Sequence, residues 1–162
     1  MKFKLFVVLL MSTVIISCKS KSAFKYSEKL VEIERSMSAD IEKTEEKFGQ
    51  FMTDEKYDSG YAISQRMEEL ADSKLKEVEK LQPPDVKEAA SFKKTALRYF
   101  SYIKELYTHY KSYARNATSE GREKELASLQ KFLGERDEIL EEMKNAQISF
   151  AKANGFRLDP AK

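Results

Sequence analysis

The two residue types most used in metal and redox chemistry occur once each in this chain of 162 residues, as Cys18 and His109. Glu105 and His109 share a helix face at a spacing of four, but a di-iron carboxylate site needs two Glu-x-x-His pairs and two further Glu. Zinc sites, disulfide frameworks and Cys-x-x-Cys-His haem attachment also need more cysteine and histidine. The sequence therefore predicts no metal, no cofactor and no catalytic residue, so the protein is not expected to be an enzyme.

Cys18 follows a segment with the features of a secretory signal. Residues 1–17 begin with lysines and continue with a short apolar stretch. The run Ile-Ile-Ser-Cys ending at Cys18 resembles the lipobox of bacterial lipoproteins. We therefore predict a cleaved lipoprotein signal peptide at 1–17. The Cys18 thiol is then expected to form a thioether to diacylglycerol, with its amine acylated, for example by palmitate. A secreted protein with one unmodified cysteine is the alternative.

The residues after Cys18 predict where the anchored protein resides. Two or more acyl chains give stable membrane attachment. Residues 18–23 form a short polar tether, whose lysines are expected near the lipid headgroups. In enteric lipoproteins an aspartate after the cysteine marks inner-membrane retention, whereas Lys19 here favours the outer membrane. Because no acidic residue occurs before Glu28, we expect the protein to face the periplasm rather than the cell surface.

Charge argues against nucleic acid as a partner. The chain has 29 basic and 27 acidic residues, and removal of residues 1–17 takes away Lys2 and Lys4, which leaves the two signs equal. Nucleic-acid-binding proteins normally carry a basic excess that neutralises phosphates. The sequence therefore predicts membrane association through the anchor, an envelope protein as a candidate partner, and no nucleic acid.

Four segments carry apolar residues at alternating spacings of three and four, the period of an amphipathic helix. They span about 23–53, 60–82, 85–117 and 120–154. Five Gly and three Pro leave too few turns for a β-sandwich or barrel. Short connections favour an all-α fold, an up-down-up-down antiparallel four-helix bundle over residues 24–155 with a tail at 156–162. A single bent helix over the first two segments, giving three helices, is the alternative.

Two polar residues, Arg136 and Gln147, occupy positions in the apolar stripe of the fourth segment. An isolated buried charge is costly, so Arg136 is expected to pair, to reach water or to lie where the bundle opens. One interpretation is a snorkelling arginine with a polar layer that sets the helix register. The other is a polar spot inside a cavity, with Arg136 and Gln147 as the residues that bind a small ligand.

The third segment carries a second stripe of aromatic and apolar residues beside its first apolar stripe. With a rotation of about 100° per residue, the two stripes are centred roughly 110° apart around the helix. We name the second one the tyrosine stripe, and its members are Tyr99, Tyr102, Leu106, His109 and Tyr113. The resulting apolar face is wider than a bundle helix needs. Either a neighbouring helix covers the stripe, or the stripe is an exposed surface for a protein partner, to which rigid amphipathic tyrosines are suited.

Four features of the chain are similar to those of a family of small, uncharacterised bacterial lipoproteins, the surface-lipoprotein type of spirochaetes and Bacteroidetes. They are the lipobox at Cys18, Leu-Gln-Pro-Pro at 81–84, the aromatic helix at 97–113, and Ala-Gln-Ile-Ser-Phe-Ala-Lys-Ala-Asn-Gly-Phe at 146–156. Beyond the lipobox, the resemblance covers about 61–158. It implies an all-helical, lipid-anchored envelope protein and supplies no catalytic residue.

These observations predict a lipid-anchored helical-bundle protein of the cell envelope with a non-enzymatic interaction or structural role. An exposed tyrosine stripe would favour that role. The alternative is a bundle that binds a small apolar ligand near Arg136 and Gln147, which requires a closed pocket containing Arg136. Convergent carboxylates in one cleft would favour an enzyme instead.

Overall fold

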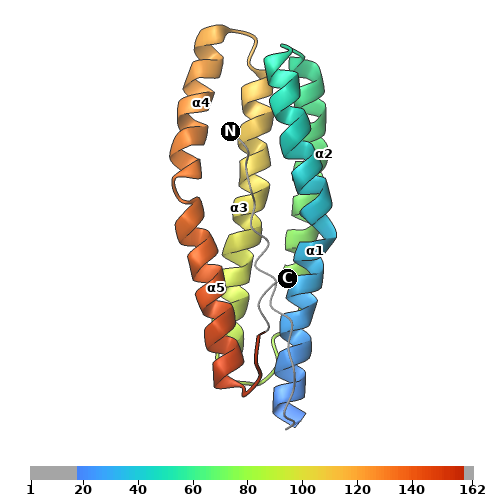
Figure 1. Cartoon of the computed structure of the whole chain (residues 1–162), viewed down its shortest axis with the longest axis vertical. Helices are drawn as coiled ribbons and strands as arrows, with labels where there is room; N and C mark the ends of the chain where they lie inside the picture. Colours follow the sequence, from blue (N-terminus) through green and yellow to red (C-terminus); the bar gives the residue numbers. More distant parts are fainter. Residues whose placement is uncertain (1–17, 159–162) are drawn as a thin grey trace.

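The computed structural model describes residues 18–158, which are 85% helical with no strand among them. Their helices run side by side along the long axis of the molecule (Figure 1). The helices are α1 Cys18–Thr53, α2 Tyr57–Lys80, α3 Ala89–Arg115, α4 Ser119–Leu133 and α5 Arg136–Ala153. The predicted all-α class and helical bundle are confirmed. The predicted signal peptide at 1–17 and the end of the tail, 159–162, lie outside the described residues.

Helix α1 begins at Cys18, five residues before the predicted start, so residues 18–23, predicted as a tether, are helical. The added turn packs against the end of α5. Ala23 is fully buried, and the Ser20 hydroxyl donates to the Asn154 carbonyl oxygen over 2.5 Å. These contacts hold residues 18–23 in the helix. None of the described helices is long and apolar enough to span a bilayer.

A distinct turn separates α1 from α2, so the alternative of one bent helix is wrong. Glu55 adopts a left-handed conformation with φ of 56°, which a continuing α-helix does not allow. The Lys56 amide donates to the Phe51 carbonyl over 2.8 Å and closes the turn. Helix α2 then starts at Tyr57, slightly before the predicted residue 60.

Helix α2 ends before Pro83 and Pro84, close to the predicted residue 82, but α3 starts at Ala89 rather than at residue 85. The difference arises because Glu88 is left-handed, with φ of 62°, and the chain turns there. The Lys93 ammonium donates to the carbonyls of Glu79 and Leu81, each over 2.7 Å. It therefore satisfies two carbonyls at the end of α2.

The fourth predicted helix is two helices, α4 and α5, with a break at Gly134 and Glu135. Helix α4 begins after Thr118, whose side chain accepts from the Gly121 amide over 3.0 Å. It is packed weakly, because Leu129 is its only buried residue and Leu126, three residues earlier, is 41% exposed. At the far end of α5, Gly155 follows with φ of 70°, a left-handed conformation in which helices commonly end.

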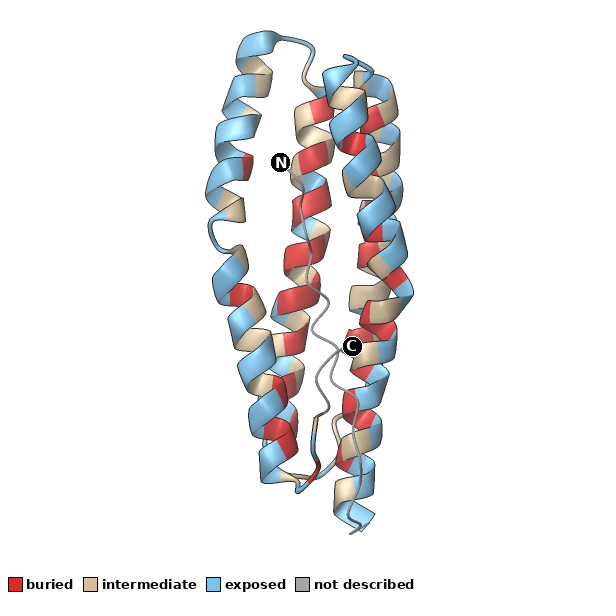
Figure 2. Ribbon diagram, in the orientation of Figure 1, coloured by how far each residue is buried: buried red, intermediate tan, exposed pale blue. Residues whose placement is uncertain are grey.

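Buried residues concentrate on α3 and on the faces of α1, α2 and α5 that point toward it (Figure 2). An aromatic cluster joins α1, α3 and α5 at the end where α5 stops. The rings of Phe92 and Phe150 stack with centroids 4.9 Å apart, and Tyr26 meets both edge-on at 6.2 and 6.1 Å. Phe156 closes the cluster at 5.8 Å from Phe150. This cluster fixes α5, whereas α4 buries only Leu129 and contacts α3 through the ring of Phe132.

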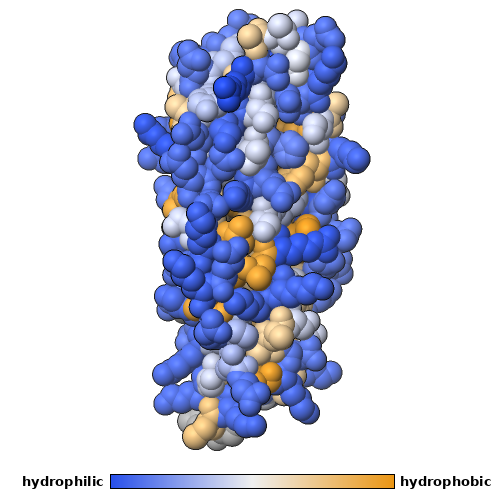
Figure 3. All heavy atoms as spheres, turned by 180° about the vertical axis from the view of Figure 1, so that it is seen from behind, coloured by the Kyte–Doolittle hydropathy of each residue, from blue (hydrophilic) through white to orange (hydrophobic). Residues whose placement is uncertain are grey.

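The face of the molecule seen in Figure 3 is largely hydrophilic, and its apolar residues form small separate areas. Among the described residues, the large apolar side chains with substantial exposure are Leu126 and Ile148. Single exposed apolar side chains are normal on soluble folds. They do not define a partner site.

Candidate functional site

The tyrosine stripe is covered, so the alternative of an exposed partner surface is wrong. Tyr99, Tyr102 and Leu106 are buried, while His109 and Tyr113 are half-buried. The covering rings come from two helices. The ring of Phe132 on α4 stacks on Tyr102 with centroids 4.5 Å apart and lies 4.7 Å from the ring of His109. The ring of Phe48 on α1 lies 6.4 Å from that of Tyr113. The wide apolar face of α3 is therefore explained by the neighbours that pack on both of its sides.

A buried carboxyl on α1 faces the tyrosine stripe. The Tyr99 hydroxyl donates to Glu34 Oε1 over 2.7 Å, and both side chains are buried. Burial raises the pKa of Glu34, and the hydrogen bond from Tyr99 and the nearby Arg35 only partly oppose this shift. Burial also raises the pKa of Tyr99, so its hydroxyl stays protonated as the donor. The pair links α1 to α3 through one hydrogen bond.

Removal of this hydroxyl should destabilise the protein measurably. In Tyr99→Phe the buried Glu34 carboxyl loses its donor, and the free energy of unfolding is expected to fall by about 1–3 kcal/mol. Tyr113→Phe is the matched control on the same helix, because the Tyr113 hydroxyl makes no hydrogen bond to a described residue. Urea unfolding at neutral pH measures both. Equal stability of the two variants would show that the Glu34–Tyr99 bond contributes nothing.

A second carboxyl–tyrosine cluster lies further along the same two helices. Glu45 accepts hydrogen bonds from the Tyr107 hydroxyl over 3.3 Å and from the Tyr110 hydroxyl over 3.0 Å. Burial raises the pKa of Glu45 to about 7, although both hydrogen bonds act to lower it. Burial likewise raises the pKa of Tyr107 and of Tyr110. The cluster therefore holds a carboxyl group that titrates near neutral pH.

The amino-acid sequence carries a signal for these buried carboxyls. Glu34 lies four residues after Leu30 and three before Met37, and Glu45 lies between Ile41 and Phe48 at the same spacings. Either position therefore falls within the α1 stripe. An acidic residue in an apolar stripe indicates a buried carboxyl that needs a donor. The tyrosines at the matching height of α3 supply it.

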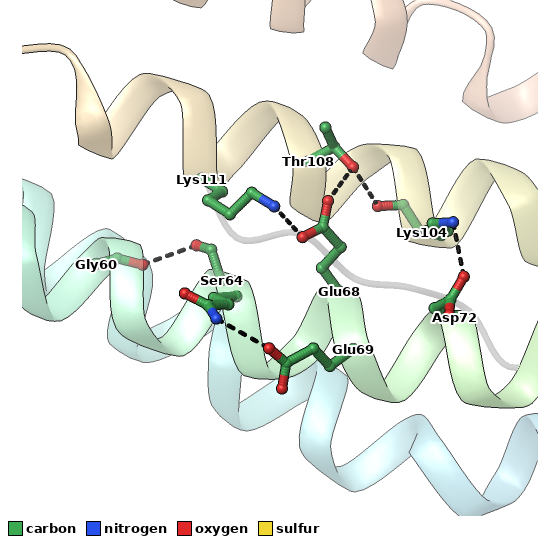
Figure 4. A network of polar contacts seen from close by, with 9 residues as sticks. Gly60, Ser64, Glu68, Glu69, Asp72, Lys104, Thr108 and Lys111 are labelled. Atoms are coloured by element: carbon green, nitrogen blue, oxygen red, sulfur yellow. Dashed lines mark hydrogen bonds and ion pairs between the residues drawn. The ribbon is translucent and has the colours of Figure 1, made fainter.

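A third polar network joins α2 to α3 (Figure 4). Glu68 accepts from the Thr108 hydroxyl over 2.5 Å and pairs with the Lys111 ammonium. Burial alone would raise the pKa of Glu68, but the hydrogen bonds from Lys111 and Thr108 outweigh it and lower this pKa. One turn away, Asp72 pairs with Lys104 at 2.6 Å. These carboxylates bind cations of the chain itself, so the network holds two helices together and presents no free base or nucleophile.

Arg136 and Gln147, predicted as a joint ligand site, do not both line the hollow beside Glu34. Gln147 is 4% exposed and lines a hollow of about 20 Å³ together with Glu34 and Tyr99. That volume holds about one water molecule. Arg136 does not line the hollow; its side chain is 32% exposed and its guanidinium pairs with Asp137 over 3.0 Å. The snorkelling interpretation of Arg136 therefore fits the structure.

Cys18 is exposed as the first residue of α1. Around it meet the start of α1, the connection between α2 and α3, and the end of α5. Ser20 binds the Asn154 carbonyl, and the Asn154 amide donates to the Lys87 carbonyl oxygen over 2.9 Å. Three parts of the chain thus fix the end of the bundle from which Cys18 projects.

The described residues contain no cluster of three or more histidine, cysteine, aspartate or glutamate side chains that could hold a metal. His109 is in ring contact with Phe132 rather than beside a set of ligands. Comparisons of the chain with protein-family models, with curated proteins and with solved structures find no match.

Proposed function

We propose that this protein is a lipid-anchored component of a Gram-negative cell envelope, with a non-enzymatic structural or interaction role. The observation that carries the proposal is Cys18. It completes a run resembling the lipobox, and its side chain is exposed at one end of the bundle. A thiol in that place is accessible to a modifying enzyme, and the attached lipid would leave the folded core intact.

The proposed architecture is an up-down-up-down antiparallel four-helix bundle, with α4 and α5 together as the fourth arm. Three observations support it. The turn at 54–56 is short, the α2–α3 and α1–α2 pairs are extensively packed, and Ser20 at the start of α1 contacts Asn154 at the end of α5. We place the protein at the periplasmic face of the outer membrane because Lys19 follows the cysteine. The likeness to small helical envelope lipoproteins is part of the same proposal.

An interaction or structural role fits the polar groups better than catalysis does. The carboxyls described above are bound to tyrosine, threonine or lysine side chains of the chain itself. The alternative of an apolar ligand between the helices is not favoured, because the hollow beside Gln147 has room for about one water. We therefore propose that the bundle acts as a rigid body held at the membrane.

Cys18→Ala tests the anchor. Expressed at full length in a Gram-negative host, the wild-type protein should incorporate an alkyne-tagged fatty acid and sediment with membranes. The variant should incorporate none, because the acceptor thiol is absent. Most of the variant chains from which residues 1–17 have been cleaved should be found outside the membrane fraction. Ser22→Ala, at an exposed position one turn away, is the matched control and should be labelled as wild type. Equal labelling of wild type and Cys18→Ala would overturn the proposal.

A further inference from the structure

The end of the bundle that carries Cys18 is rich in exposed basic side chains. Three stretches of the described chain, 18–25, 79–88 and 152–158, meet there (Figure 1). They contain seven basic residues against the three acidic residues Glu79, Asp85 and Glu88. The basic residues, all exposed, are Lys19, Lys21, Lys25, Lys80, Lys87, Lys152 and Arg157. We call this surface the basic end.

None of these seven cations forms an ion pair or a hydrogen bond through its side chain with another described residue. The opposite end differs. There, stretches 50–60 and 113–124 carry four basic and five acidic residues. Lys56 pairs with Asp54 at 2.9 Å, and Lys124 pairs with Glu120 at 2.8 Å. Residues 18–162 carry equal numbers of both signs, so the excess of four positive charges at the basic end is local and is balanced elsewhere in the chain.

The basic end is also hollowed. A depression of about 320 Å³ lies where its three stretches meet, and Lys19 of α1 and Lys87 of the α2–α3 connection both line it. Ser20 and Asn154 complete the polar part of its wall. This volume lies at the lower end of the range for small-molecule sites. Two lysines that line such a hollow can bring their ammonium groups to one phosphate group.

We propose that the basic end is a docking surface for anionic phospholipid headgroups, with a headgroup phosphate bound between Lys19 and Lys87. The orientation of the surface toward a membrane rests on the proposed anchor at Cys18, which projects from the same end. Basic residues beside an anionic leaflet each strengthen attachment, and their effect decays within a Debye length of about 8 Å at physiological salt. The free cations of this end would then hold the bundle upright on the membrane.

Vesicle binding without the lipid anchor tests the surface directly. The protein used is the chain from residue 18 to 162 with Cys18→Ser, which keeps every described residue of the core; circular dichroism verifies its helicity. Sedimentation compares binding to two kinds of vesicle. One is pure phosphatidylcholine, and the other is an equimolar mixture of phosphatidylcholine and phosphatidylglycerol. We expect binding to the anionic vesicles alone, and release as salt rises toward about 1 M, where the Debye length shrinks to about 3 Å.

Charge reversal locates the binding to one end. The triple variant Lys19→Glu, Lys87→Glu and Lys152→Glu changes one residue in each stretch of the basic end and should weaken the vesicle partition constant by at least about tenfold. The matched control changes the net charge equally at exposed lysines of the other half, as Lys56→Glu, Lys124→Glu and Lys131→Glu. It should retain most of the binding.

Three outcomes would overturn the docking surface. Equal binding to both vesicle types would mean apolar insertion, and equal loss in the two triple variants would mean that only net charge matters. No binding to either vesicle would leave an acidic envelope protein as the partner for the free cations. The anchor is tested separately by fatty-acid labelling of Cys18. Labelling without vesicle binding would refute the docking surface but not the anchor. Vesicle binding without labelling would refute the anchor but not the docking surface.

Discussion

Phe150→Ala is expected to lower the free energy of unfolding by about 3–5 kcal/mol, the usual cost of removing a buried phenylalanine side chain. Phe150 is fully buried. Its ring stacks on Phe92 of α3 and meets Tyr26 of α1 edge-on, so its loss opens a cavity between three helices. Because α4 contributes one buried residue, the remaining contacts of the α4–α5 arm compensate poorly. Urea unfolding measures this loss. The slope of the unfolding free energy against urea concentration should be the same in the variant and the wild type.

Ile148→Ala provides the matched control for this substitution. Ile148 lies two residues before Phe150 on the same helix, but its side chain is 41% exposed. A surface substitution of this kind normally changes stability by about 0.5 kcal/mol or less. A loss below about 1 kcal/mol in Phe150→Ala, similar to the control, would mean that the aromatic cluster does not fix α5 to the rest of the bundle.

The helices were predictable because each buries one stripe at the helical period. The α3 stripe and the proline break before it locate α3 to within a few residues. The start of α3 at Ala89 was not predictable, because it depends on the left-handed Glu88, a conformation that sequence rarely reveals for a non-glycine residue. The break at Gly134 was missed because apolar spacing continues across it. Only packing shows that Leu126 lies outside the core.

The candidate sites depended on which neighbour covers which face, and periodicity does not contain this information. The tyrosine stripe was identified as a distinct face, but its burial depends on Phe132 and Phe48, which lie on other helices. Arg136 and Gln147 share a stripe in sequence, yet only Gln147 reaches the hollow beside Glu34. The free cations of the basic end come from three separate stretches. Their convergence follows from the order and direction of the helices and is invisible in local charge patterns.

Glu45 should make the protein less stable as pH rises. Burial raises the folded-state pKa of Glu45 to about 7 from an ordinary 4.5. The folded protein therefore binds more protons than the unfolded chain between these values, and stability must fall as pH rises through this window. The shift, discounted for the partial exposure of the side chain, corresponds to about 2 kcal/mol of stability lost by about pH 8.

Glu45→Gln isolates this effect, because an amide oxygen still accepts a hydrogen bond but does not titrate. At about pH 8 the variant should be more stable than wild type by about 2 kcal/mol, and near pH 4.5 or below the two should agree within about 0.5 kcal/mol. Thermal unfolding across this pH range measures the difference. Burial also raises the pKa of Glu34, so Glu34 also makes the protein less stable as pH rises. This loss of stability is the same in the variant and the wild type, and it cancels when the two are compared.

Glu46→Gln is the control, since Glu46 is the exposed neighbour of Glu45 on the outer side of α1. This surface substitution should change the free energy of unfolding by no more than about 0.5 kcal/mol. If Glu45→Gln were instead less stable than wild type at about pH 8, the two tyrosine hydroxyls would stabilise the ionised carboxylate by more than burial costs it. The Glu45 cluster would then be a charged clamp between α1 and α3 at neutral pH, and the cause of its strength would be the convergence of Tyr107 and Tyr110 on one carboxylate.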